Sequence, residues 1–299
     1  MEFEKVFLNE YGFYELKNKP TLEERKNEFE NEYYQQSMAS YQNEYSEKEL
    51  KMFHNSIKRK EMLINNSLEK AGNIKNEKDR RILDVGCGEG FVLNYFYNNG
   101  WDVTGIDFSS YGIEHNNPDM SEYLLKGDCD EILPELIRKG EKYDVINMDA
   151  FLDMALNPKN VLDNCTELLD ENGVLVVKVA NNYSRLQLHL LENGKLKKEY
   201  WLDEKGHPSY FGKDSLKTFV EANGYEMIDL SCESLIDLNL FNDLTNYYEV
   251  PGVGKKCYEA RVEMENMYND ISPELSLELF RIYAQMGFGR EIVGVFVKS

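Results

Sequence analysis

Three glycines stand at alternate positions, Gly86, Gly88 and Gly90, directly after a short strand-like run at 81–85. Because glycine lacks a Cβ, a loop of this kind lets the backbone approach a bound nucleotide closely. A dinucleotide loop has the form G-x-G-x-x-G, whereas this loop has the form G-x-G-x-G with an acidic residue, Asp84, two positions before it. The spacing therefore favours a nucleotide-type cofactor other than NAD.

Further acidic residues follow at the ends of later apolar runs. Asp107 closes the run at 101–107, Asp128 follows the run at 121–127, and Asp149 follows the run at 142–148. Carboxyl ends of parallel strands meet at one edge of a sheet, which is where open α/β proteins bind ligands. We expect these carboxylates to lie around one site.

These residues need a parallel sheet to bring them together. Strand-like runs at 81–86, 101–107, 121–127, 142–148 and 173–180 alternate with helical segments, and runs at 225–231 and 290–299 add two further strands. This alternation is typical of an α/β fold, and it predicts a doubly wound, seven-stranded, mostly parallel sheet.

Two segments outside this alternation have helical periodicity. Residues 1–75 predict a helical N-terminal cap, in which Thr21 and Glu24 have the spacing of a capping box. Residues 76–299 form the main domain in this interpretation, and 235–288 form a helical insertion before the last strand that covers the substrate site.

Composition excludes several classes of function. The formal net charge of −20 opposes binding to nucleic acid or to an anionic membrane. No apolar run reaches the length of about 18 residues that a membrane span needs, and the N-terminus lacks a secretory pattern, so we expect a cytoplasmic protein with no stable membrane insertion. The five cysteines and four histidines show no metal-ligand spacing, so we expect no metal site.

The stretch ILDVGCGEG at 82–90 matches the first motif of the class I S-adenosylmethionine-dependent methyltransferases, and the chain resembles that family over about 150 residues. The resemblance implies a Rossmann-like methyltransferase fold with S-adenosylmethionine as cofactor and S-adenosylhomocysteine as product. It also implies a set of cofactor-binding residues: Asp84 near the cofactor's amino group, Gly86, Cys87, Gly88 and Gly90 along the loop, Asp107 at the ribose hydroxyls, Phe108 beside adenine, Asp128 and Cys129 at the adenine amine, and Asn147 and Met148 near the methyl.

Transfer to a hydroxyl acceptor benefits from a general base. His207 lies in HPSYF at 207–211, which resembles a segment that many relatives place over the active site. His207 is the first candidate and Asp149 the second, with His189 and His54 behind them. Each of them also has an ordinary structural interpretation, as a surface or hydrogen-bonding residue.

The acceptor is less well defined by the sequence. The motif that holds a planar amino nitrogen in relatives is absent, because NMDAF stands at 147–151. The N-terminal segment resembles that of bacterial methyltransferases of surface-polysaccharide (capsule) pathways. This resemblance implies a sugar-type or other small acceptor, and we expect a hydroxyl or other oxygen of a glycan, a nucleotide-sugar or a phosphorylated precursor. Tyr34, Tyr41 and Arg290 are candidate substrate-binding residues, with packing or a plain ion pair as their alternatives.

Other functions stay open at this stage. The motifs predict cofactor binding more directly than turnover, so a catalytically silent regulatory or scaffold protein is the main alternative. Methyl transfer to a nitrogen or carbon of a small metabolite is another, and aminopropyl transfer is disfavoured because dense acidic motifs are missing. The sequence does not define the oligomeric state.

Overall fold

The computed structural model describes residues 3–27 and 44–299. Its central feature is a seven-stranded sheet with the order β5-β4-β3-β6-β7-β10-β9. The strands are β3 (Arg81–Val85), β4 (Asp102–Asp107), β5 (Leu124–Lys126), β6 (Tyr143–Asp149), β7 (Leu169–Ala180), β9 (Tyr225–Glu233) and β10 (Glu291–Lys298). The first five strands pair in parallel, while β10 runs antiparallel to both β7 and β9. The predicted fold class is confirmed.

The register of the parallel strands aligns the ends that carry the predicted site residues. Asp84 of β3 lies opposite Gly105 of β4 and Asn147 of β6. At the end of β6, Asp149 lies opposite Lys178 of β7. The carboxyl ends of β3, β4 and β6 therefore share one edge of the sheet.

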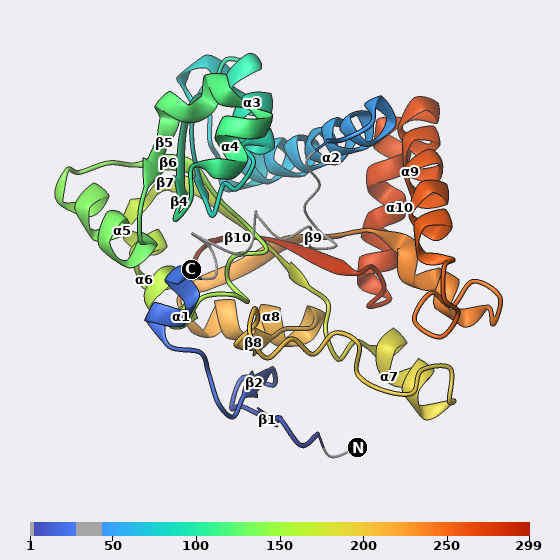
Figure 1. Cartoon of the computed structure of the whole chain (residues 1–299). Helices are drawn as coiled ribbons and strands as arrows, with labels where there is room; N and C mark the ends of the chain where they lie inside the picture. The colour runs from blue at the N-terminus through green and yellow to red at the C-terminus, as the bar shows by residue number, and fades with distance from the viewer. Residues whose placement is uncertain (1–2, 28–43) are drawn as a thin grey trace.

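Helices cover both faces of this sheet (Figure 1). One face packs against α2 (Glu47–Ala71), α3 (Phe91–Asn98) and α4 (Tyr111–Asn116), whose apolar side chains include Leu63, Leu93 and Ile113. The other face packs against α5 (Cys129–Arg138), α6 (Pro158–Leu168) and α8 (Lys213–Ala222). Burial on both faces explains why the central strands are nearly continuous apolar runs.

Helix α2 has a capping residue at each end. Ser46 is the N-cap, and its side chain accepts from the Glu49 amide while the Glu49 carboxylate accepts from the Ser46 amide. This reciprocal capping box satisfies two amide groups at the start of the helix. At the other end, Gly72 has φ +81°, a left-handed conformation that glycine adopts without strain.

The N-terminal segment differs from the predicted all-helical cap. Strands β1 (Val6–Leu8) and β2 (Tyr14–Leu16) form a hairpin, and β2 also pairs with β8 (Ser209–Tyr210), before a short α1 (Leu22–Asn27). Asn9 shapes the hairpin turn, because its side-chain oxygen accepts from the Tyr11 and Phe13 amides. Each strand spans three residues or fewer, which is too short for a clear alternating pattern in the sequence.

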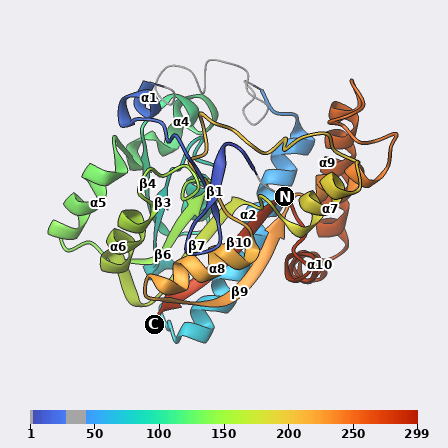
Figure 2. The same cartoon turned by 90° about the horizontal axis from the view of Figure 1, so that it is seen from below.

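The late insertion contains a helical hairpin. After the 3₁₀ segment at Leu235–Phe241, α9 (Gly254–Ile271) and α10 (Pro273–Gln285) lie beside each other, and α9 packs against α2 (Figure 1). The excursion between β7 and β8 contains α7 (Arg185–Glu192). In both views α5 and α6 lie on one side of the molecule, and α9 and α10 lie on the other (Figure 2).

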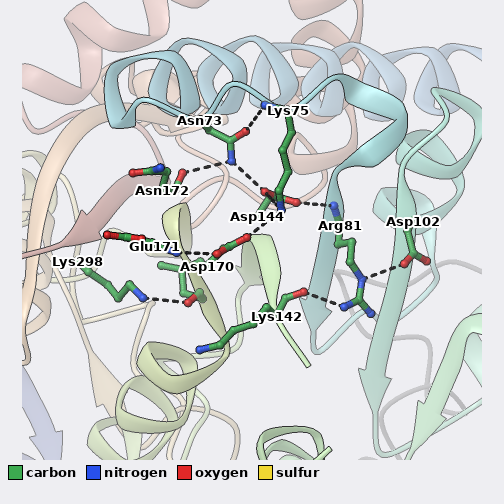
Figure 3. A network of polar contacts seen from close by, with 11 residues as sticks. Asn73, Lys75, Arg81, Asp102, Lys142, Asp144, Asp170, Glu171, Asn172 and Lys298 are labelled. Carbon is green, nitrogen blue, oxygen red and sulfur yellow. Dashed lines mark hydrogen bonds and ion pairs between the residues drawn. The ribbon is translucent and has the colours of Figure 1, made fainter. Parts of the chain in front are cut away.

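At the amino edge of the sheet, a polar network joins the end of α2 to the strands (Figure 3). Asp144 at the start of β6 is fully buried. It accepts from Asn73 at 2.9 Å and from the Arg81 amide at 2.9 Å, and it pairs with Lys75 at 2.8 Å. Because this edge is remote from the carboxyl ends of the strands, the network belongs to the scaffold.

Among the described helices, none combines the length and apolar character that a membrane crossing requires.

Candidate functional site

A cavity of about 220 Å³ opens at the carboxyl edge of the parallel strands. Residues from the strand ends, the following loops and α1 line it: Leu22, Arg25, Gly86, Gly88, Glu89, Ile106, Asp107, Phe108, Gly127, Asp128, Cys129, Asp130, Asp149, Ala150, Phe151, Met154, Ala155, Leu156, Asn157 and Val161. Carboxylates and glycine backbone thus meet apolar side chains in one concave site, as in pockets for small molecules and cofactors.

The glycine loop forms one wall of this cavity. Gly86 has φ +80°, and a Cβ built on it would lie 2.6 Å from the ring of Phe151, so only glycine fits there. The Gly86 and Cys87 amides both donate to the Ile106 carbonyl, at 2.8 and 3.0 Å. These contacts hold the loop against β4 and leave its backbone facing the cavity.

Asp107 ties the loop to the second strand. Its Oδ2 accepts from the Gly88 amide at 2.9 Å, and its Oδ1 accepts from the Ser109 amide at 2.9 Å. Burial raises the pKa of Asp107, although the backbone donors oppose the shift. Both oxygens keep further acceptor capacity, since each carboxylate oxygen has two lone pairs.

Asp128 lies at the start of α5. Its Oδ1 accepts from the Asp130 amide at 3.0 Å, so it is the N-cap of this helix, and its Oδ2 lies 3.6 Å from the Lys26 ammonium. Cys129 follows it and also lines the cavity. The helix start therefore presents a carboxylate and backbone amides to the same space.

Glu89 was not predicted, although it belongs to the glycine loop. It lines the cavity, and its Oε1 accepts from the Tyr45 hydroxyl at 2.8 Å and from the Asn116 amide group at 3.0 Å. Burial raises its pKa to about 7. An acidic residue inside a cofactor motif was the available signal.

Five predicted cofactor residues do not line the cavity: Asp84, Cys87, Gly90, Asn147 and Met148. Asp84 is 2% exposed, and its Oδ1 accepts from the Asn147 side chain at 2.6 Å. Burial, together with the negative charge of Asp149, raises the pKa of Asp84 to about 7. Asp84 thus links β3 to β6 through Asn147, and its role toward the cofactor stays a prediction.

Asp149 reaches the cavity from the end of β6 and is held by two lysines. Lys60 of α2 donates to its Oδ2, and Lys178 of β7 lies 3.2 Å from the same oxygen. Burial alone would raise the pKa of Asp149, but the charges of Lys178 and Lys60 lower it. Lys178 also pairs with Glu233 at 3.2 Å. The sequence does not reveal Lys60, which lies 89 positions from Asp149.

His207 lies beside the cavity wall and does not line it. Its Nδ1 is 3.4 Å from Oδ2 of the buried Asp153, and its side chain is 27% exposed. Burial lowers the pKa of His207, but the contact with Asp153 outweighs this and raises the pKa overall. Arg25 joins the adjacent loops by donating to the Gly206 and Met154 carbonyls, each at 2.7 Å.

The predicted substrate residues have separate outcomes. Tyr34 and Tyr41 lie outside the described residues. Arg290 directly precedes β10, and it donates to Asp237 at 2.9 Å and to the hydroxyls of Tyr247 and Tyr248 at 3.1 and 2.9 Å. Its guanidinium also lies 5.4 Å from the ring centroid of Tyr200. Arg290 thus holds an aromatic cluster together, outside the lining of the cavity.

Backbone strain concentrates at this edge of the sheet. Among the described non-glycine residues, three have positive φ: Ala150 (50°), Tyr183 (52°) and Ser234 (56°). They follow the carboxyl ends of β6, β7 and β9. Residues in this region carry a cost of roughly 1–3 kcal/mol each and cluster at functional sites.

The cavity meets the demands of a nucleoside cofactor with an amino-acid end. It combines a wall without Cβ atoms at Gly86, carboxylates at Asp107 and Asp128, and a buried carboxylate oxygen, Asp149 Oδ1, that has no hydrogen-bond partner within 3–27 and 44–299. This fold and a cavity at this edge of the sheet are typical of one class of enzyme, the Rossmann-like methyltransferases.

The comparisons with known proteins agree with this class. A family model described as a methyltransferase domain matches residues 57–230, which is more than half of the chain, and the chain belongs to this methyltransferase family. The ubiquinone biosynthesis O-methyltransferase of Coxiella burnetii (strain Dugway 5J108-111) is 24% identical over 160 residues, covering 52% of this chain and 67% of the relative. That of Actinobacillus pleuropneumoniae serotype 5b (strain L20) is 25% identical over 175 residues, covering 56% and 73%.

Two matching solved structures are more distant in sequence. A SAM-dependent methyltransferase from Archaeoglobus fulgidus has a TM-score of 0.46 and 18% identity, covering 74% of this chain and 86% of that chain. The plantazolicin methyltransferase, solved with a desmethyl analogue and SAH, has a TM-score of 0.48 and 15% identity, covering 83% and 85%. No polysaccharide-pathway enzyme is among these relatives, and the predicted link to such pathways is not supported.

Proposed function

We propose that the chain transfers a methyl group from S-adenosylmethionine to an oxygen of a small acceptor, with the cavity at the carboxyl edge as the cofactor site. The single observation that carries this proposal is the joint lining of one cavity by Gly86, Gly88, Asp107, Asp128 and Asp149, which come from successive strand ends. Asp107 is assigned to the ribose hydroxyls, and Asp128, Cys129 and Phe108 to adenine.

The bound cofactor supplies an electrophilic methyl on a sulfonium, and the chain's residues position it and exclude water. An in-line displacement depends on alignment at near-attack distance. Apolar side chains around the cavity include Leu22, Phe151 and Met154. Arg25 of α1 holds the adjacent loop by donating to the Met154 carbonyl. Apolar side chains that exclude water from the cavity strengthen the electrostatic interactions inside it.

We assign the general base to His207 and its orientation to Asp153. Asp153 is fully buried, and its Oδ2 lies 3.4 Å from Nδ1 of His207, so the carboxylate favours the tautomer with a proton on Nδ1 and leaves Nε2 to accept a proton. Asp149 is the weaker candidate, because Lys178 and Lys60 lower its pKa despite its burial. A carboxylate held ionised in this way has little affinity for a proton.

For the acceptor, we infer a hydroxyl group of a small molecule. The matching relatives are O-methyltransferases by name, which supports oxygen over nitrogen. The glycan or nucleotide-sugar acceptor expected from the N-terminal segment has no support among them, and the cytoplasmic location stays a prediction.

Two measurements on the full chain test the proposal. Isothermal titration calorimetry with S-adenosylhomocysteine should show one binding site per chain. Transfer of a labelled methyl group from S-adenosylmethionine should then be measured against a panel of phenols, catechols, sugar nucleotides and amines. Absence of binding would contradict the cofactor assignment, and labelling of amines alone would contradict the oxygen acceptor.

A further inference from the structure

Helix α10 carries apolar side chains on two opposite faces. The inner face buries Phe280 and Ala284 in the core of the protein. The outer face is a stripe of four apolar residues that lie along one side of the helix and its C-cap: Leu275, Leu279, Ile282 and Met286. Leu275 is 67% exposed, Ile282 52% and Met286 48%. A surface helix normally turns a polar face to solvent, so this second apolar face indicates a contact outside the chain.

The preceding helix, α9, has an outer stripe of the same kind. Its members are Ala260, Met264, Met267 and Ile271. Met267 is 53% exposed and Ile271 69%, whereas Val262 and Asn269 on the opposite face are buried. Only Ser272 separates α9 from α10, so the two stripes meet at the tip of the hairpin, on the outer side of the molecule (Figure 1).

The α10 stripe has a spacing that is symmetric about its midpoint. Its members lie four, three and four positions apart, as in the seam between two paired helices. The spacing is the same when the helix is read in the opposite direction. Two antiparallel copies across a two-fold axis therefore place Leu275 opposite Met286 and Leu279 opposite Ile282. The α9 stripe repeats this spacing, so the face fits a second copy of the same chain.

Charges beside the α10 stripe are paired within the chain. A protein with a net charge of −20 repels its own copy over most of its surface, so self-association needs a face of this kind. Glu278 pairs with Arg281, and Arg281 pairs with Asp229 at 2.6 Å. In the antiparallel arrangement, Glu278 lies near the uncharged Gln285 of the second copy. A strongly basic partner would instead favour a row of unpaired carboxylates.

The extent of this face also bears on its occupant. A standard interface buries about 800 Å² per partner around an apolar centre. One stripe of four side chains is small for such a centre, whereas the two stripes extend it across both helices. Large contiguous apolar surfaces are uncommon on monomers and mark sites of interaction.

We propose that the α9–α10 hairpin pairs with the same hairpin of a second copy across a two-fold axis, so that the stripes of both chains form one four-helix contact. The inference goes beyond the proposed function, because no residue of either stripe lines the cofactor cavity. It assigns a role to two helices that lie outside the matched methyltransferase domain at 57–230.

Sedimentation equilibrium of the full chain over a range of protein concentrations tests the proposal. The unmodified chain should show a reversible equilibrium between monomer and dimer. Ile282→Glu places a charge near the middle of the seam in both copies, so it should raise the dissociation constant of the dimer at least tenfold. Because Ile282 is half-exposed, the variant should keep the circular dichroism spectrum and the Tm of the monomer fold.

Leu125→Glu is the matched control. Leu125 is 38% exposed and lies on β5, at the opposite edge of the sheet from β9, against which α10 packs. The same change of an exposed leucine to a charged residue there should leave the dissociation constant unaltered.

A mixture of two variants tests the antiparallel register. Leu275→Lys and Met286→Glu should each weaken the dimer alone, because each buries a charge without a partner in the seam. Mixed in equal amounts, they should form a heterodimer more stable than either homodimer, since the introduced lysine of one chain then faces the introduced glutamate of the other.

A chain that stays monomeric at every concentration would leave the stripes to another occupant and overturn the proposal. A dimer that Ile282→Glu leaves intact would place the contact elsewhere and overturn it too. Failure of the mixed variants to associate would overturn the two-fold antiparallel arrangement. None of these measurements requires cofactor binding, so they are independent of the proposed function.

Discussion

Oδ2 of Asp107 accepts a hydrogen bond of 2.9 Å from the amide of Gly88, so the carboxylate that ends the second parallel strand braces the glycine loop that follows the first. The same side chain lines the cavity and carries the ribose contact in the proposed function. Asp107 therefore both shapes the loop and presents an acceptor to the ligand.

Asp107→Ala should weaken S-adenosylhomocysteine binding by about tenfold or more, because it removes an acceptor and releases the Gly88 amide. Calorimetry on the full chain measures this change. Asp102→Ala is the control, since Asp102 lies at the other end of the same strand and forms an exposed pair with Arg81 at 2.9 Å. Unchanged binding in Asp107→Ala would refute the ribose assignment.

Asp153→Asn should lower the pKa of His207, because it removes the negative charge that opposes the effect of burial. Proton NMR titration of the histidine Cε1–H resonances measures the shift, and the signal lost in His207→Ala identifies the residue. His189→Ala, a change on α7, should leave the titration of His207 unaffected. An unmoved pKa in Asp153→Asn would show that Asp153 does not orient the proposed base.

His207→Ala should reduce turnover at least a hundredfold, because a general base typically raises the rate of a reaction by about 10²–10⁴-fold. Its affinity for S-adenosylhomocysteine should stay close to that of the unmodified chain, since His207 does not line the cofactor cavity. Steady-state rates with the acceptor found in the labelling panel, together with calorimetry, separate the two effects. Equal rates with and without the imidazole would remove His207 from the mechanism.

Glu89→Gln should stabilise the protein at pH 8 and have little effect at pH 5. Burial raises the pKa of Glu89 from 4.5 to about 7, so the folded state binds more protons than the unfolded state between these values. Stability from this group is complete below the unfolded pKa and falls as pH rises through the folded pKa. We expect a gain in Tm of roughly 2–6 °C at pH 8, because glutamine keeps the acceptor for Tyr45 without the charge. A gain that is equal at both pH values would contradict the shift.

Asp144→Asn should lower the free energy of unfolding by about 2–4 kcal/mol, because it leaves buried donors and the Lys75 ammonium poorly paired. Asp170 is the other carboxylate that contacts Lys75, and its side chain is 37% exposed (Figure 3). Asp170→Asn should therefore lower the free energy of unfolding by less than about 1 kcal/mol. Urea unfolding measures both. S-Adenosylhomocysteine affinity should stay constant in both variants, since the network lies at the opposite edge of the sheet.

Much of the fold was predictable because it depends on local patterns. The seven strands appear as apolar runs, and the glycine loop has a characteristic spacing, so the sheet and the cofactor edge follow from short stretches of sequence. The N-terminal hairpin was missed because β2 gains its second partner from β8, nearly two hundred positions away. Short strands of this kind depend on distant pairing for their stability.

The sequence by itself determined which residue types stand at the strand ends, and hence the class of cofactor. Only the tertiary structure decided which of these residues face the cavity: Asp107, Asp128 and Asp149 line it, whereas Asp84 lies beneath it. It also brought Lys60 to Asp149 and Asp153 to His207. Side-chain direction, burial and the charges that shift a pKa arise from packing between segments far apart in the chain, and no local spacing encodes them.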